Sequence, residues 1–326
     1  MRILAGDIGG THARLATFRT EGGKLRRIRK RTWRSADYET PLPILREYLD
    51  DEEEPPDRAC LGLAGPVEEG TSRLPNLGWK VRREELAAAT GIPWLRLIND
   101  FRAVGRGVLL LEEEQLATLQ EGGTEPGAPV ALIGAGTGLG IGYLAATRSP
   151  PRVYASEGGH ADFAPRNETE WCLTRFLIKR YGRASCERVL SGEGLVDIYR
   201  YLRGRELSQA ASGGGTGTDA EDPAAAISRR GLAGDDPLAE RALEIFVSAY
   251  GALAGNVALT VGARGGVFVA GGIAPKILEA LRSGPFLESF RSKGRMRGYM
   301  ENISVRVVLD EDVGLLGAAA AAFGVS

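Results

Sequence analysis

The sequence has few of the residues that build most metal and redox sites. It contains two histidines, His12 and His160, and three cysteines, Cys60, Cys172 and Cys186, with no CxxC pair among them. Two histidines are too few for a histidine-rich metal site. We expect reduced, partly buried thiols in a reducing cytosol.

The sequence also lacks an excess of either charge and, near its C-terminus, a long apolar run. It has 41 basic and 42 acidic residues, so its composition indicates neither nucleic acid nor an anionic membrane as a partner. The apolar run at 313–325 is too short to span a bilayer and contains glycine. Asp7 stands where a signal peptide would need an apolar run. We therefore expect a cytoplasmic protein.

Two common nucleotide-binding motifs are absent. No GxxxxGK followed by Ser or Thr occurs, which excludes a P-loop. The glycine run at 134–140 is not GxGxxG, because Leu139 and Ile141 fall where the third glycine would stand. A Rossmann dinucleotide site is therefore unsupported.

Glycine, in contrast, is abundant, with 45 of 326 residues, about twice its usual share. Short apolar runs that end at glycine alternate with helical spacing, which predicts an α/β fold. The length suits two domains, which we place at 1–110 and 111–310. The polar, glycine-rich stretch at about 208–222 is expected to be a flexible insertion. Asp236 and Pro237 predict the start of a helix.

The first glycine turn follows an apolar run that begins at Ile3. Gly9 and Gly10 would let backbone N–H groups and the Thr11 hydroxyl approach a phosphate closely. Asp7, just before the turn, could face a Mg²⁺ ion directly or through water. An ordinary hairpin turn with an incidental acid is the alternative.

The second glycine turn includes Gly136, Thr137 and Gly138, and it again stands between two apolar runs. One glycine hairpin in each domain suggests that the two could hold the phosphates of one nucleotide across a cleft.

Two further segments carry polar side chains suited to a polyhydroxylated ligand. In the first, Asp100 could take the proton of an attacking hydroxyl, although Asn99 and Asp100 also suit a helix N-cap. In the second, glycines between Glu157 and His160 indicate a loop that presents an acceptor and a donor. Glu187 lies in a charged stretch, where a lone glutamate is usually solvated.

Together, six motifs in this order resemble those of the bacterial glucokinase family, and the match runs nearly end to end. They are Gly6-Asp7-Ile8-Gly9-Gly10-Thr11, Ile98-Asn99-Asp100-Phe101, the glycine run 134–140, Glu157-Gly158-Gly159-His160, the segment from Glu187 to Gly192, and Gly271-Gly272-Ile273. The resemblance implies the actin-like, ribonuclease-H-like ATPase fold with an interdomain catalytic cleft. It also implies that the C-terminal helix 311–326 completes the first domain, and that the protein is a homodimer.

The resemblance further implies ATP-dependent phosphorylation of D-glucose at the 6-hydroxyl, with Mg²⁺ arriving with ATP and Asp100 as the catalytic base. The glucose ligands would be Asn76, Asn99, Asp100, Glu157, His160 and Glu187. The phosphate-binding segments would be Gly9, Gly10 and Thr11 in one domain and Gly136, Thr137 and Gly138 in the other. Gly271 and Gly272 would lie near the adenosine.

The chain departs from the family pattern in a few places. His12 stands where asparagine is usual, Pro75 replaces a usual threonine, and the glycine-rich insertion is not a family feature. The zinc-binding cysteine cluster of the related repressor–open reading frame–kinase family is missing, so we expect no zinc site.

Three rival functions stay open at this point. The first is a kinase for another hexose, which a panel of sugars would reveal. The second is a non-catalytic sugar sensor on the same fold, which would need a helix-turn-helix ahead of the first strand. The third is an ATPase without a small substrate, which the motif from Glu157 to His160 disfavours.

Overall fold

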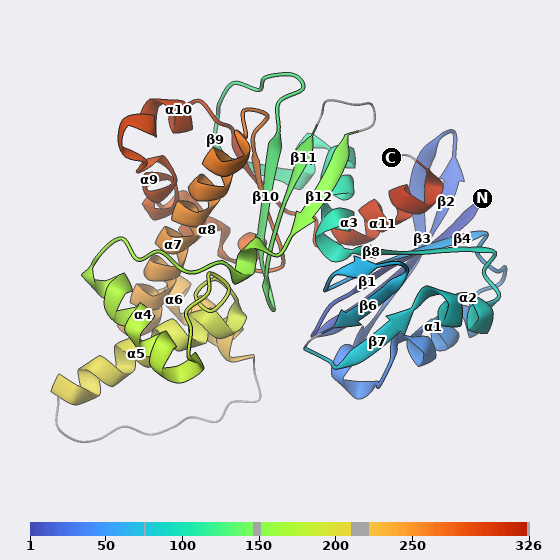
Figure 1. Ribbon diagram of the computed structural model, residues 1–326, viewed down its shortest axis with the longest axis horizontal. Coiled ribbons are helices and arrows are strands. Elements are labelled where there is room, and N and C mark those ends of the chain that lie inside the picture. Colours follow the sequence, from blue (N-terminus) through green and yellow to red (C-terminus); the bar gives the residue numbers. More distant parts are fainter. Residues whose placement is uncertain (75, 146–150, 210–221, 325–326) are drawn as a thin grey trace. The chain divides into compact units, whose positions relative to one another are not determined.

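The computed structural model describes residues 1–74, 76–145, 151–209 and 222–324 (Figure 1). Pro75 and most of the expected insertion, residues 210–221, lie outside the described residues. By internal contacts, the chain divides into unit 1 (Met1–Leu116, Gly142–Ala155 and Asp310–Ser326) and unit 2 (Ala117–Ile141 and Ser156–Leu309). Both contain sheet and helix, which confirms the predicted α/β class.

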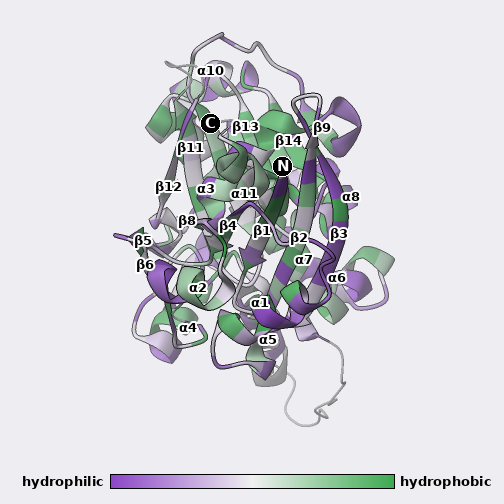
Figure 2. Cartoon of the chain, turned by 90° about the vertical axis from the view of Figure 1, so that its right-hand side faces the viewer, coloured by the Kyte–Doolittle hydropathy of each residue, from purple (hydrophilic) through white to green (hydrophobic). Residues whose placement is uncertain are grey.

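Unit 1 is built on a five-stranded sheet with the order β3-β2-β1-β4-β8. Its strands are β1 (Arg2–Ile8), β2 (His12–Glu21), β3 (Lys24–Arg34), β4 (Arg58–Leu63) and β8 (Trp94–Asn99). β1 and β2 form the predicted antiparallel hairpin, whereas β1, β4 and β8 run parallel. The edge strand β3 is rich in arginine and is coloured mostly hydrophilic in Figure 2, which discourages pairing with another chain.

Helices cover both faces of this sheet. One face packs against α1 (Pro41–Asp50) and α2 (Arg83–Thr90), and the other packs against α3 (Asp100–Gly107) and the alanine-rich α11 (Val313–Phe323). A small sheet of β5 (Val67–Glu68), β6 (Thr71–Leu74) and β7 (Trp79–Arg82) extends from the connection between β4 and α2.

The α3–α11 contact depends on glycine. A Cβ atom on Gly107 would lie 2.0 Å from the Val313 carbonyl oxygen, and one on Gly317 would lie 1.8 Å from the Ala103 oxygen. The two helix backbones therefore touch directly, and this contact holds the helix that starts at Asp100.

The second sheet is six-stranded, with the order β12-β11-β10-β13-β14-β9. Its strands are β9 (Leu116–Gln120), β10 (Val130–Ala135), β11 (Leu139–Ala145), β12 (Arg152–Ser156), β13 (Val267–Ala270) and β14 (Val305–Val308). The second predicted glycine turn joins β10 to β11, which are neighbours in the sheet. β10, β13 and β14 run parallel.

Among the helices of unit 2, the long apolar α7 (Pro237–Val261) packs on β10. The others are α4 (Glu168–Tyr181), α5 (Gly192–Gln209), α6 (Pro223–Ala233), α8 (Leu278–Arg282), α9 (Pro285–Arg291) and α10 (Arg297–Glu301). As predicted, Asp236 caps α7, with its carboxylate accepting from the N–H groups of Leu238 and Ala239. By length and composition α7 could cross a membrane, but 72% of its apolar window is buried, as in a core helix.

Candidate active site

The parallel strands of unit 1 bring two acids to the end of the sheet where the carboxyl ends of these strands meet. Asp7 in β1 is in register with Gly62 in β4, which is in register with Ile98 in β8. Asn99 ends β8 and Asp100 begins α3. Since neighbouring strands lie about 4.8 Å apart, Asp7 and the start of α3 are separated by about two strand spacings.

Asn99 takes the capping role at the start of α3. Its Oδ1 accepts from the Arg102 N–H at 3.1 Å, and its Nδ2 donates to the Gly65 carbonyl oxygen at 3.2 Å. The predicted N-cap is therefore confirmed for Asn99, and its side chain ties α3 to the end of β4. Asp100 stands one residue further, in the first helical turn, where its Oδ1 accepts from the Phe101 N–H at 2.8 Å.

Gly62 lets α3 pack closely against β4, a role that the sequence analysis did not assign to it. A Cβ atom here would lie 3.3 Å from the Ala103 Cβ and 3.6 Å from the Asp100 Cα. A glycine inside an apolar strand often marks such an approach, so the signal was present in the sequence.

Asp7 lies between the guanidinium group of Arg14 and the first turn of α11. Arg14 Nη1 lies 3.4 Å from Asp7 Oδ2 and also donates to the Glu311 carbonyl oxygen at 3.3 Å. Burial raises the pKa of the Asp7 carboxyl, Arg14 opposes that shift, and Asp312 adds to it. About a quarter of the Asp7 side chain stays exposed, so a ligand can reach this carboxylate.

The turn with Gly9, Gly10 and Thr11 is braced by Ser35, a second residue that sequence reasoning missed. The Ser35 hydroxyl donates to the Gly9 carbonyl oxygen at 2.8 Å, and its N–H donates to the Thr11 carbonyl oxygen at 3.0 Å. No local pattern announces this role, because Ser35 follows β3 and meets the turn only in the folded sheet.

In unit 2, Glu187 joins the second glycine turn to the loop from Glu157 to His160. Its Oε2 accepts from the Leu139 N–H at 2.9 Å, and its own N–H donates to the Gly159 carbonyl oxygen at 2.9 Å. A Cβ atom on Gly138 would lie 2.6 Å from Glu187 Oε2, so Gly138 leaves room for the carboxylate. Glu187 is thus a fixed part of this turn, although its charged neighbourhood in the sequence favoured a solvated side chain.

His160 stands between two carboxylates in unit 2. Its Nδ1 lies 3.8 Å from Glu187 Oε1, and its Nε2 lies 3.9 Å from Glu157 Oε2. Both separations exceed a hydrogen bond, so a hydroxyl or a water can bridge them. The side chains of His160 and Glu157 are about 60% exposed, which leaves this cluster accessible.

Gly271 and Gly272 follow β13 beside the second glycine turn. Gly271 has φ +84°, and a Cβ atom on it would lie 2.4 Å from the Ala135 carbonyl oxygen. The same oxygen accepts from the Ile273 N–H at 3.2 Å. The positive φ and the close approach both require glycine at 271, whereas the space beside Gly272 is open.

Two other residues considered in the sequence, Asn76 and His12, are exposed in unit 1. Asn76 is exposed in the turn between β6 and β7, in the small sheet, whereas Asn99 and Asp100 lie where β8 meets α3. The nearby Trp79 is buried, with its indole N–H donating to the Tyr38 carbonyl oxygen. His12 is exposed, and its carbonyl oxygen accepts from the Gly9 N–H.

The described residues contain no group of three or more His, Cys, Asp or Glu side chains placed to hold a metal ion. Asp7 offers one accessible carboxylate, which suits Mg²⁺ because that ion commonly binds one or two protein carboxylates together with water and substrate phosphates.

The known proteins to which this chain is similar are glucokinases. A family model described as Glucokinase matches residues 4–324. The glucokinase of Nostoc sp. (strain PCC 7120) is 43% identical over 333 residues, covering 97% of each chain. The glucokinase of Hahella chejuensis is 37% identical and covers 98% of this chain and 96% of its own.

Solved structures show the same fold. Glucokinase from an Antarctic psychrotroph superposes with a TM-score of 0.81 and 32% identity, covering 99% of each chain. A ROK family glucokinase from Streptomyces griseus, solved with glucose and AMPPNP, matches with a TM-score of 0.69 and 23% identity over 99% of this chain and all of its own. The family model and these relatives cover nearly the whole sequence, and the chain therefore belongs to the glucokinase family of ATP-dependent hexose kinases.

Proposed function

We propose that the protein transfers the γ-phosphoryl group of ATP to the 6-hydroxyl of D-glucose, giving glucose 6-phosphate and ADP. The observation that carries this proposal is that Asp7 and Asp100 both lie at the carboxyl ends of the parallel strands of the unit 1 sheet. One acid stands beside a braced glycine turn, and the other stands at a helix start that Asn99 caps. Family membership and the names of the similar proteins support the same reaction.

Asp100 is the proposed general base. A carboxylate that accepts the proton of the 6-hydroxyl makes that oxygen a better nucleophile as the phosphoryl group arrives. The contacts of Asn99 with Gly65 and Arg102 fix the first turn of α3, and so limit where the Asp100 carboxylate can stand. Positioning of this kind contributes much of the catalysis of phosphoryl transfer.

The proposed sugar ligands are Asn76, Asn99, Asp100, Glu157, His160 and Glu187. The gaps of nearly 4 Å between His160 and its two carboxylates suit sugar hydroxyls. A hydroxyl can donate to a carboxylate or to an imidazole nitrogen that carries no proton, and it can accept from an imidazole N–H. Because Glu187 also receives the Leu139 N–H, it couples sugar contacts to the second glycine turn.

The proposed nucleotide ligands are the backbone and small side chains of Gly9, Gly10, Thr11, Gly136, Thr137, Gly138, Gly271 and Gly272. Successive N–H groups in such turns bind phosphate oxygens. Asp7 would hold a Mg²⁺ ion through water, and the ion would screen the phosphate charge when it arrives with ATP.

The fold family, the domain bounds, the oligomeric state and the cellular location are proposed from the family resemblance. It comprises an actin-like ATPase fold with an interdomain cleft, domains at 1–110 plus 311–326 and at 111–310, a homodimer, and a cytoplasmic location. A kinase for another hexose is the second candidate function, because the wider group of matching structures includes one described as a putative N-acetylmannosamine kinase.

A coupled assay with ATP and a panel of glucose, galactose, fructose, N-acetylglucosamine and N-acetylmannosamine tests the proposal. We expect glucose to have the highest kcat/KM, and Asp100→Asn to lower kcat by about 10²–10⁴-fold. Asp50→Asn, at the exposed end of α1, is the matched control and should keep normal activity. A higher kcat/KM for another sugar would replace the glucose assignment, and normal turnover in Asp100→Asn would remove the base.

A further inference from the structure

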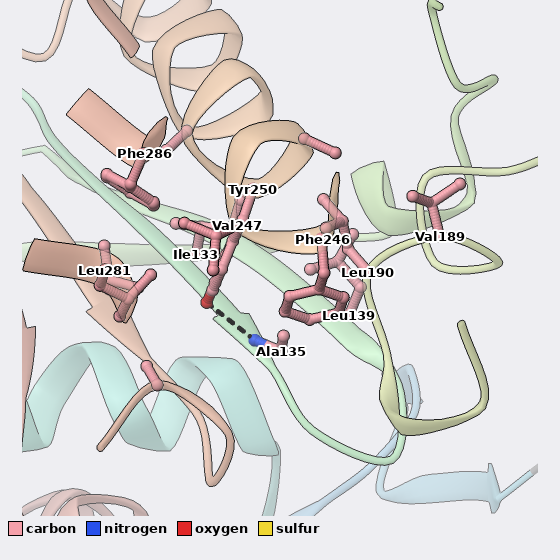
Figure 3. Close-up of a cluster of buried hydrophobic side chains, with 14 of the residues drawn as sticks. Ile133, Ala135, Leu139, Val189, Leu190, Phe246, Val247, Tyr250, Leu281 and Phe286 are labelled. Carbon is pink, nitrogen blue, oxygen red and sulfur yellow. Dashed lines mark hydrogen bonds between the residues drawn. The ribbon is translucent and has the colours of Figure 1, made fainter. Parts of the chain in front are cut away.

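Tyr250 is a fully buried tyrosine of α7. Its hydroxyl reaches the end of β10 at Ala135 (Figure 3) and the end of β13 at Ala270. The phenol oxygen accepts from the Ala135 N–H at 3.0 Å and donates to the Ala270 carbonyl oxygen at 3.4 Å. Its ring packs edge-on against Phe246 and Phe286, with centroids 5.9 and 5.8 Å away. The hydroxyl is therefore held in place from several sides.

The two strand ends that Tyr250 contacts lead directly into two glycine turns. β10 and β13 are paired from Ala131 with Val267 to Gly134 with Ala270, where the paired register ends. Beyond that pair, β10 enters the turn at Gly136, and β13 enters the turn at Gly271. The Tyr250 hydroxyl thus stands where the direct ladder between the strands stops.

Both backbone groups of Ala135 are used to connect these turns. Its carbonyl oxygen accepts directly from the Ile273 N–H at 3.2 Å, just after Gly272. Its N–H is linked to the Ala270 carbonyl oxygen through the Tyr250 hydroxyl. Removing that hydroxyl takes away one of these two links and leaves the Ala135 N–H buried without its partner.

We propose that Tyr250 is a positioning residue for the nucleotide, whose hydroxyl fixes the separation between the turn at Gly136–Gly138 and the turn at Gly271–Gly272. The inference rests on the proposed binding of ATP by these turns. It gives the buried phenol a role in ATP affinity that involves no contact with the nucleotide and no proton transfer. Burial raises the pKa of the Tyr250 phenol, so the hydroxyl stays protonated and can donate to the Ala270 carbonyl oxygen.

The role predicts a selective defect in Tyr250→Phe, which keeps the ring and removes the hydroxyl. We expect the KM for ATP to rise about tenfold while the KM for glucose changes less than about twofold. A tenfold change is at the lower end of the cost expected when a buried donor, here the Ala135 N–H, loses its partner. ADP binding, measured by calorimetry, should weaken by a similar factor. Tyr201→Phe is the matched control, because Tyr201 lies in the same core and its hydroxyl contacts Arg205, not a strand end.

Stability measurements separate positioning from simple loss of packing. The melting temperature of each variant is recorded, and kinetics are measured well below it. If Tyr250→Phe does not fold, Tyr250→Met fills much of the same space without a hydroxyl and takes its place. Equal changes in the two KM values, or an unchanged KM for ATP in a folded variant, would overturn the proposal. Absence of ATP-dependent sugar phosphorylation by the unaltered protein would instead refute the proposed function.

Discussion

The contact between α3 and α11 offers a direct test of how the fold positions Asp100. In Gly317→Ala, the new Cβ would stand 1.8 Å from the Ala103 carbonyl oxygen, whereas ordinary contact begins at 3.4 Å. The difference means that one helix must move by about 1.6 Å. The obstacle is a backbone oxygen, so no side-chain rotation can relieve the clash.

The expected magnitude follows from two opposing effects. Overpacking costs about 1–3 kcal/mol and occasionally more, while replacing a helical glycine with alanine returns up to about 1 kcal/mol. Taking the upper end of the first range, we expect a net loss of about 2 kcal/mol. For a unit of this size that loss lowers the melting temperature by roughly 4–8 °C. Because α3 begins at Asp100, a shift of this kind should also lower kcat, by about 10–100-fold.

The assay compares two glycine-to-alanine variants by urea unfolding and by steady-state kinetics. Gly204→Ala is the matched control, because Gly204 lies within α5 and a Cβ atom added to it would meet no atom within 4 Å. The control should be as stable as the unaltered protein or slightly more stable, with normal kcat. The reasoning fails if Gly317→Ala matches the control in both stability and kcat.

Three further predictions concern side chains outside α3. Glu187→Gln should raise the KM for glucose roughly tenfold or more and the KM for ATP less, because a charged sugar ligand is lost while the amide oxygen can still accept the Leu139 N–H. Burial lowers the pKa of Lys293 from 10.5 to about 8, so between these values the unfolded chain binds more protons and the free energy of unfolding should rise with pH. Urea titrations of Lys293→Met should lack this component of the rise. Burial also raises the pKa of the Cys60 and Cys186 thiols, to about 12 and about 11, so mass spectrometry after brief iodoacetamide treatment should find only Cys172 modified.

Local sequence features predicted much of the secondary structure and one part of the site. The glycine turn after Ile8 forms the β1–β2 hairpin, Asp236 caps α7, and Asn99 caps α3. These predictions succeeded because a turn or a cap depends on residues only a few positions apart. Helix ends depend on more distant contacts: α3 ends at Gly107 and continues as a 3-10 turn, at the point where α11 approaches its backbone.

The contacts that hold the candidate site together could not be predicted in this way. Ser35 braces a turn 26 residues earlier, Glu187 accepts from a backbone group 48 residues away, and Tyr250 meets a strand end 115 residues away. No periodicity or motif in the sequence indicates these contacts, because they form only when sheets and helices pack.

The sequence by itself determined the α/β class, the glycine turns, the helix caps and the resemblance to the glucokinase family, since each depends on residue type at short spacing. Only the tertiary structure decided that Asp7 and Asp100 lie at the same end of the sheet, that Gly62 and Gly317 let backbones touch, and that Tyr250 links two glycine turns. The physical reason is that these relations depend on strand register and close packing, which join segments far apart in the chain.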